Sequence, residues 1–250
     1  MGYPKIVGNP PGKKMKYKFR IAINLTFAIA MAWVEAAVVI YLRTMINRVN
    51  PYQVDPLPIV GDLGQIELVR EAATLMMLLC VGWLSGRNTR SRLAYAVIAF
   101  GVWDIFYYIF LRMMGPWPTS LLDWDILFLF PLPWWGPVLA PVLIAMLLIT
   151  GGLMITQLEE RGPVRVPVRS ILIAFGGVLL ALYVFMEDAL TAFHGGIEAI
   201  RGVLPASFNW PLFIVAFLFM AVPGFEIALQ VRQKRGRREA KPIRVREVSK

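Results

Sequence analysis

Residues 21–42 read IAINLTFAIAMAWVEAAVVIYL, and this stretch decides the fold class. It contains one charged side chain, Glu35, and about 20 mostly apolar residues are enough for a helix to cross the hydrocarbon core of a bilayer. Five more runs of this kind follow, at Ile66–Leu84, Leu93–Leu111, Trp135–Ile155, Ile171–Phe193 and Trp210–Val231. The sequence therefore predicts an all-α, polytopic transmembrane helical bundle with six spans.

The composition of the whole chain agrees with this prediction. Hydrophobic residues make up 58% of the 250 positions and the mean hydropathy is +0.61, whereas a soluble domain has roughly 45 to 50% apolar residues. A water-soluble or disordered chain is therefore excluded. A single cysteine, Cys80, and a single histidine, His194, also exclude a disulfide framework, a cysteine-based zinc site and a multi-histidine metal centre.

The distribution of basic residues predicts the orientation. Of the 26 Lys and Arg residues, 21 lie in segments 1–20, 85–92, 156–170 and 232–250. Since positively charged loops stay in the cytoplasm, we expect a basic cytoplasmic N-terminus (1–20), a six-helix domain (21–231) and a basic cytoplasmic tail (232–250). This arrangement is typical of a multi-pass protein of the bacterial inner (plasma) membrane. The expected partners are the lipid bilayer and, through the tail, anionic lipid head groups, but not nucleic acid.

Residues 112–141 depart from the pattern of simple spans. They are rich in proline and tryptophan, and their apolar core, residues 121–130, is too short to cross a bilayer. Proline on both sides prevents a helix from continuing through it. We expect a short interfacial or re-entrant helix before the fourth span, or alternatively a loop, with an aromatic belt at the outer surface. The expected anchors are Trp117, Trp124, Trp134 and Trp135.

Acidic residues inside the spans are the main functional signal, because an ionisable side chain in hydrocarbon costs at least about 2.5 kcal/mol. Four spans each place one carboxylate at a similar depth below the predicted outer surface: Glu35, Glu71, Asp104 and Glu187. His194 lies on the same helical stripe as Glu187. These five residues form the predicted cation- or proton-binding site. The predicted supporting residues are Glu67, Arg70, Tyr107, Asp123, Asp125 and Asp188.

Three functions are compatible with these acids. In the first, the five site residues bind a divalent metal (Fe, Mn, Ca or Mg) for membrane-associated chemistry. In the second, they carry protons or cations in a coupled transporter. In the third, the protein is an accessory or anchor subunit of a larger membrane complex. The acids can also be purely structural and hold the bundle together by pairing with Arg43, Arg70 and Arg112, with Arg70 reaching Glu67 at i−3. Because the sequence has no phosphate-binding loop or metalloprotease motif, it assigns neither catalytic residues nor an enzyme class.

Overall fold

The computed structural model describes residues 17–54, 62–159 and 166–239 of the chain. Six helices in this part are long and apolar enough to cross a membrane, which confirms the predicted fold class. The protein is therefore a multi-pass integral membrane protein. Its long helices are α1 (Tyr17–Met45), α2 (Asp62–Ser85), α3 (Thr89–Met114), α4 (Leu139–Glu159), α5 (Val168–Ala192) and α7 (Trp210–Glu239).

Several helix ends differ from the predicted boundaries. Helix α1 already includes residues 17–20, and α7 continues through residues 232–239 of the predicted tail. Helix α4 begins at Leu139 and not at Trp135, because the residues before it form a strand. Many of the basic residues used to predict orientation lie outside the described residues, namely Lys5, Lys13, Lys14, Lys16, Arg161, Arg165 and those of segment 240–250.

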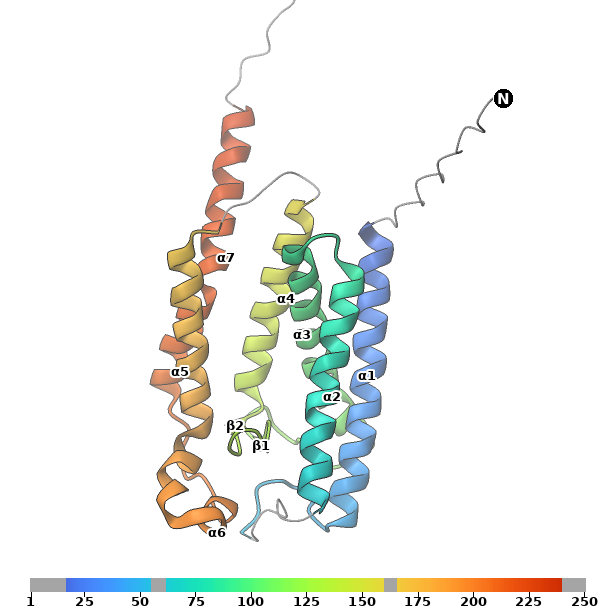
Figure 1. Cartoon of the computed structure of the whole chain (residues 1–250), viewed down its shortest axis with the longest axis vertical. Helices are drawn as coiled ribbons and strands as arrows, with labels where there is room; N and C mark the ends of the chain where they lie inside the picture. Colours follow the sequence, from blue (N-terminus) through green and yellow to red (C-terminus); the bar gives the residue numbers. More distant parts are fainter. Residues whose placement is uncertain (1–16, 55–61, 160–165, 240–250) are drawn as a thin grey trace, which may run out of the picture.

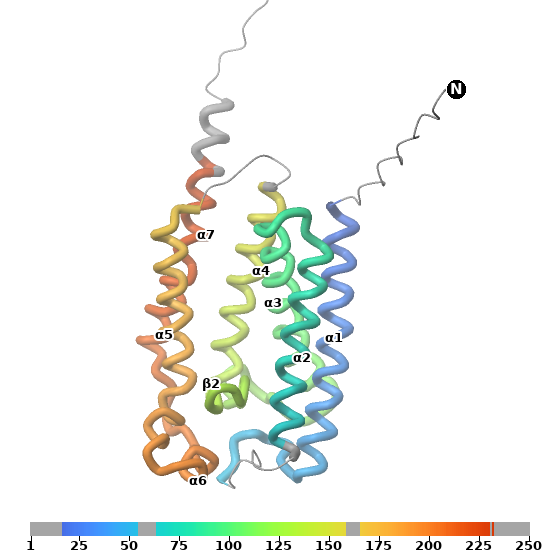
Figure 2. Tube along the Cα trace, viewed as in Figure 1, coloured from blue at the N-terminus to red at the C-terminus, as the bar shows by residue number. Residues whose placement is uncertain are grey.

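The helices form two groups (Figure 1). Helix α3 packs against α1, α2 and α4, while α5 and α7 pack mainly against each other and α7 also contacts α4. Figure 2 shows the pair of α5 and α7 beside the other four helices. Helix α1 begins and α7 ends at the same end of the bundle, here called the terminal end. The opposite end, where the chain passes from α3 to α4, is called the hairpin end. It remains a prediction that the terminal end faces the cytoplasm.

Small residues bring the helices together in the half of the bundle nearest the terminal end. A Cβ atom added to Gly82 of α2 would lie 2.3 Å from the backbone nitrogen of Ala96 on α3. One added to Gly152 of α4 would lie 2.8 Å from the carbonyl oxygen of Ala94. Backbones approach this closely in membrane bundles where one helix presents glycine or alanine to the next. This half of the molecule is thus closely packed.

The segment between α3 and α4, residues 115–138, forms an antiparallel ribbon, here called the hairpin. Strand β1 (Trp124–Ile126) pairs with β2 (Trp135–Pro137), and the Leu127 N–H donates to the Trp134 carbonyl at 2.8 Å. The predicted helix in this segment is therefore wrong, and the loop alternative agrees better. Proline lacks a backbone N–H and so interrupts helical hydrogen bonding. Two predicted surface anchors, Trp117 and Trp135, are instead buried, with exposures of 5% and 1%.

Two short helices follow α5 at the hairpin end. They are η1 (Phe193–Gly195) and α6 (Gly196–Arg201), and the chain turns between them at Gly196, whose φ of 77° favours glycine. His194 lies in η1, is exposed, and contacts the ring of Phe193. The histidine therefore lies outside the interior of the bundle.

Candidate functional site

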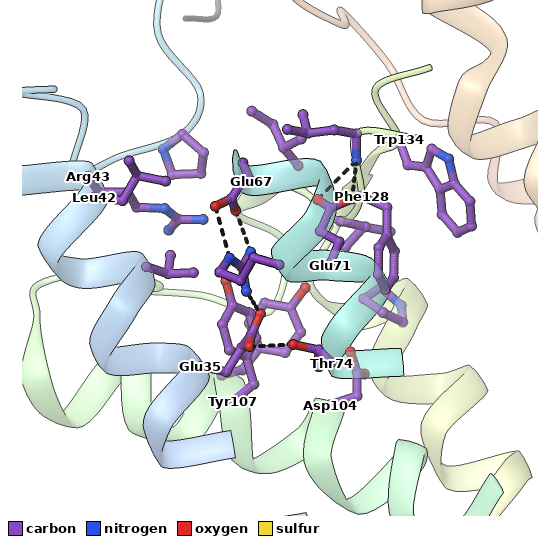
Figure 3. A pocket seen from close by; sticks show the side chains of 18 of the residues that line it. Glu35, Leu42, Arg43, Glu67, Glu71, Thr74, Asp104, Tyr107, Phe128 and Trp134 are labelled. Atoms are coloured by element: carbon purple, nitrogen blue, oxygen red, sulfur yellow. Dashed lines mark hydrogen bonds and ion pairs between the residues drawn. The ribbon is translucent and has the colours of Figure 1, made fainter. Parts of the chain in front are cut away.

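A cavity of about 220 Å³ lies at the hairpin end, between α1, α2, α3 and the hairpin (Figure 3). Helices α4 and α5 complete its wall with Ile144 and Phe185, and the hairpin contributes residues 126–129 and Trp134. A dry cavity of roughly 150 Å³ already admits benzene. The space is therefore large enough for a small organic molecule.

Helix α2 presents a polar stripe to this cavity. Glu67, Arg70, Glu71 and Thr74 are spaced three, one and three residues apart, so that they share one face of the helix. All four line the cavity, whereas the other faces of α2 expose mostly apolar side chains. The spacing in the sequence thus directs the polar groups of this span into the protein and away from lipid.

Arg70 neutralises two carboxylates from different helices. Its guanidinium forms ion pairs with Glu35 of α1 and with Glu67 on its own helix, as Figure 3 shows. The Thr74 hydroxyl donates a further hydrogen bond to Glu35 Oε2 at 2.9 Å. The predicted pairing of Arg70 with Glu67 is confirmed. These contacts satisfy the buried carboxylate of Glu35 and tie α1 to α2.

A second ion pair attaches the hairpin to α1. Arg43 Nη2 donates to Asp125 Oδ1 at 2.8 Å, and the Tyr108 hydroxyl donates to Oδ2 at 3.2 Å. The Arg43 guanidinium also lies 4.5 Å from the ring centroid of Trp117. Burial raises the pKa of Asp125, although the positive charge of Arg43 favours the ionised carboxylate. Arg43 is thus held by the hairpin through both charge and stacking.

Glu71 attaches the hairpin to α2. The backbone N–H of Leu129 lies 3.1 Å from each carboxylate oxygen of Glu71. A hydrogen bond to a charged acceptor is about twice as strong as one between neutral groups. Glu71 of the transmembrane helix α2 therefore holds the part of the hairpin that lines the cavity.

Asp104 differs from these acids because no ion pair or hydrogen bond to its carboxylate is found among the residues that the structure describes. It lies on α3, ten residues before the end of the helix or about 15 Å along its axis, and its exposure is 8%. Its Oδ2 atom has no hydrogen-bond partner among the residues that the structure describes. The charge that acts on it is that of another acid, Asp125. Asp104 is therefore a buried carboxylate in need of a partner.

Aromatic rings form much of the remaining wall. On α3, the ring centroids of Phe100 and Trp103 are 5.5 Å apart and those of Trp103 and Tyr107 are 5.9 Å apart. On the other side, Trp134 of the hairpin stacks on Phe185 of α5 at 6.4 Å. Asp104 shares a helical face with Phe100 and Tyr107, at spacings of four and three residues. The unpaired carboxylate therefore lies among aromatic side chains.

The charges that line the cavity do not balance. Four acids (Glu35, Glu67, Glu71 and Asp104) face three arginines. Arg43 is paired with Asp125, and Arg48 donates to the carbonyls of Pro51 and Gln53. Of these lining arginines, only Arg70 is left to neutralise the acids. The described residues of the lining therefore include more carboxylates than arginines.

The predicted site residues are only partly brought together. Glu35, Glu71 and Asp104 line one cavity, whereas Glu187 and His194 do not. Glu187 lies on α5, where Asn209 Nδ2 approaches its carboxylate at 3.5 Å. Its depth is similar to that of the other acids, but α5 packs with α7 and not with α1 to α3. Depth along a helix therefore did not determine which acids meet.

The predicted supporting residues also separate into two sets. Glu67, Arg70 and Tyr107 line the cavity, and Asp125 lies behind it in the pair with Arg43. Asp123 instead accepts a hydrogen bond from the Thr119 hydroxyl at 2.9 Å, within a turn of the hairpin.

Asp188 and Arg112 also have no part in the cavity. Asp188 is half-buried on α5, away from the cavity wall. The predicted pairing partner Arg112 donates to the carbonyl of Pro116 at 3.3 Å.

Several residues of the cavity were not predicted. Thr74 could have been found, because it continues the stripe of Glu67, Arg70 and Glu71 by one more turn. Trp103, Phe128 and Phe185 carry no such signal, since aromatic residues are frequent throughout the chain. Their place in the wall depends on how the helices and the hairpin pack.

Among the described residues, no three His, Cys, Asp or Glu side chains lie close enough together to hold a metal ion. The metal hypothesis therefore gains no support from the geometry. Comparisons of the chain with protein-family models, with curated proteins and with solved structures found no match. The fold and the site define a six-span integral membrane protein with a charged, aromatic cavity at one end.

Proposed function

We propose that this protein binds a small organic ligand in the cavity at the hairpin end. The observation that carries the proposal is the combination, in one space of about 220 Å³, of an aromatic wall with a buried carboxylate for which the described part of the chain provides no partner. Ligand sites in proteins are mostly apolar, with a few polar groups that fix the orientation of the ligand. The apolar part of the ligand lies against the rings, and its polar part lies near Asp104.

An organic ligand fits this site better than a metal ion. Calcium takes six to eight oxygen ligands and magnesium requires near-octahedral coordination. The lining carboxylates are instead occupied separately: Glu35 and Glu67 by Arg70, and Glu71 by the Leu129 N–H. The cation-dependent chemistry inferred from the sequence therefore has weaker support than the binding of a molecule with an apolar body.

The transporter inferred from the sequence would use the same cavity. It is supported by the depth of Asp104, since unpaired acids within spans are typical of ion and proton pathways. It predicts flux of a solute or of protons in liposomes that Asp104→Asn abolishes. If the protein is instead an accessory subunit, other membrane proteins co-purify with it, and the same proteins co-purify with the Asp104→Asn variant. A transporter would also have to bind its ligand in this cavity, so that it shares the binding step with the proposed function.

Calorimetric titration of the full chain in nanodiscs tests the proposal. The probes are three benzyl compounds of similar size: benzyltrimethylammonium, benzyl methyl sulfone and benzyl sulfonate. At least one of them binds saturably to the protein above the signal of empty nanodiscs. Ile144→Trp fills the cavity from α4 and weakens this binding by about tenfold or more.

Met146→Trp is the matched control for this variant. Met146 lies on the same helix but is 45% exposed on the bundle surface, so that a larger side chain there leaves the cavity unchanged. Absence of saturable binding by all three probes would overturn the proposal. Equal binding by wild type and Ile144→Trp would overturn it as well, because the probe would then bind elsewhere.

A further inference from the structure

We infer that the ligand of this cavity is an organic cation, whose ammonium group lies between Asp104 and the aromatic rings of α3. This inference rests on the proposed function and names the chemical class of the ligand. It starts from a buried acid: Asp104 is 8% exposed, lines the cavity, and has an oxygen without a hydrogen-bond partner among the described residues. A buried charge requires a partner or a proton, because solvation is lost on burial.

Arg43 and Arg70, two of the three arginines that line the cavity, are already committed to other acids, and the third, Arg48, donates to backbone carbonyls. Arg43 is held by Asp125 at 2.8 Å and by its stacking on Trp117. Arg70 lies between Glu35 and Glu67 and pairs with both. Moving either arginine to Asp104 would leave another buried carboxylate without its partner, which is typically more costly than the gain. In this proposal the positive charge comes from a bound molecule, and the alternative is a proton on Asp104.

The surroundings of Asp104 favour an ammonium group over a hydrated metal ion. Phe100 and Tyr107 lie on the same face of α3, and the ring of Trp103 is stacked on that of Tyr107. A cation over the face of such a ring is attracted by the quadrupole of the ring, and aromatic side chains recognise quaternary ammonium ions in this way. The rings also replace water around the methyl groups of such an ion. A metal ion would need oxygen ligands that these rings do not supply.

The same three benzyl probes test this inference, because they differ in charge. Benzyltrimethylammonium is expected to bind the wild-type protein about tenfold more tightly than benzyl methyl sulfone, and benzyl sulfonate to bind most weakly. In Asp104→Asn the preference for the cation over the sulfone disappears, while the affinity for the sulfone remains. The retained binding of the sulfone shows that the variant is folded. Asp104→Glu keeps the charge and retains at least part of the preference.

Glu198→Gln provides the control for a general charge effect. Glu198 lies on α6 at the hairpin end, is exposed, pairs with Arg201 and does not line the cavity. Its removal leaves the preference for the cation unchanged. The inference is overturned if the sulfone or the sulfonate binds as tightly as the cation, since Asp104 then holds only a proton. It is also overturned if Asp104→Asn keeps the preference. Neither result contradicts the proposed function, because a probe still binds saturably to the protein in both.

Discussion

The two ends of the bundle differ in what surrounds an arginine side chain in the interior. At the terminal end, Arg20 is 4% exposed, donates to the carbonyl of Ser85 at 3.1 Å, and lies over the ring of Tyr95. At the hairpin end, Arg70 faces two carboxylates and an open cavity. A backbone carbonyl and an aromatic ring are among the partners of the first arginine. Arg70 instead pairs with side chains that, like itself, line the cavity.

This difference follows from the size of the residues between the helices. Near the terminal end, glycine and alanine let α2 and α4 each approach α3 so closely that an added Cβ would overlap the α3 backbone. Near the hairpin end, aromatic and charged side chains occupy the same interfaces and hold the helices apart. Glycine and alanine contacts thus join the helices in one half of the bundle, while ion pairs and hydrogen bonds join them around the cavity in the other.

The largest expected effect comes from removing the central charge of the hairpin end. Arg70→Met leaves the buried Glu35 and the half-buried Glu67 without their counter-ion, and we expect a loss of roughly 3 kcal/mol in unfolding free energy. Thermal unfolding in detergent measures it as a lower transition temperature. The double variant Arg70→Met, Glu35→Gln recovers part of the loss, because one of the unpaired charges is gone. A double variant as unstable as the single one would contradict this explanation.

The next effect concerns the closely packed half. Gly82→Ala places a Cβ against the backbone of Ala96, and we expect a destabilisation of about 2 kcal/mol. Gly151→Ala is the matched control on α4, since no atom lies within 4 Å of a Cβ at that position. The control should be neutral or slightly stabilising, because alanine favours helix. Equal effects of the two changes would show that α2 and α3 do not approach as closely as described.

A smaller effect is expected from the contact between the hairpin and α2. Glu71→Gln replaces a charged acceptor of the Leu129 N–H by a neutral one and costs about 1 kcal/mol. Hydrogen exchange of the Leu129 amide becomes faster in this variant. The control is Glu226→Gln, which breaks a pair with Arg169, a side chain that is 78% exposed. Exposed pairs contribute little, so this control leaves both stability and the Leu129 amide nearly unchanged.

The smallest change in stability is expected at Asp104. Asp104→Asn removes an unpaired buried charge, so that the unfolding free energy stays within about 0.5 kcal/mol of the wild-type value or rises. This result would set Asp104 apart from Glu35 and Arg70, whose charges stabilise the bundle. A loss as large as that of Arg70→Met would mean that Asp104 belongs to the structural ion pairs, and the contrast between the two kinds of acid would fail.

The fold could be predicted because each span is a continuous apolar run, and such a run can satisfy its backbone in a bilayer only as a helix. The stripe from Glu67 to Thr74 and the pair of Arg70 with Glu67 also follow from helical spacing. These features are local. They depend on residues of one helix and not on the neighbours of that helix.

The lateral arrangement of the helices could not be predicted in this way. Glu187 has the same depth as Glu35, yet it lies on α5, which packs with α7 and contributes only Phe185 to the cavity wall. The hairpin was missed because its two strands are three residues long, too short for an alternating pattern. The pairing of Arg43 with Asp125 depends on that hairpin. Helical spacing places Phe100 and Tyr107 beside Asp104, but the neighbours of Asp104 from other elements follow only from the three-dimensional arrangement.

The hairpin connects more of the protein than its length suggests. Through the chain it joins α3 to α4, through Asp125 it holds α1, through Leu129 it holds α2, and at Gly136 it rests against Phe185 of α5. A tilt of any of these helices relative to the others therefore pulls on the same 24 residues. The hairpin thus couples the positions of five helices, α1 to α5, although it is not itself one of the membrane spans.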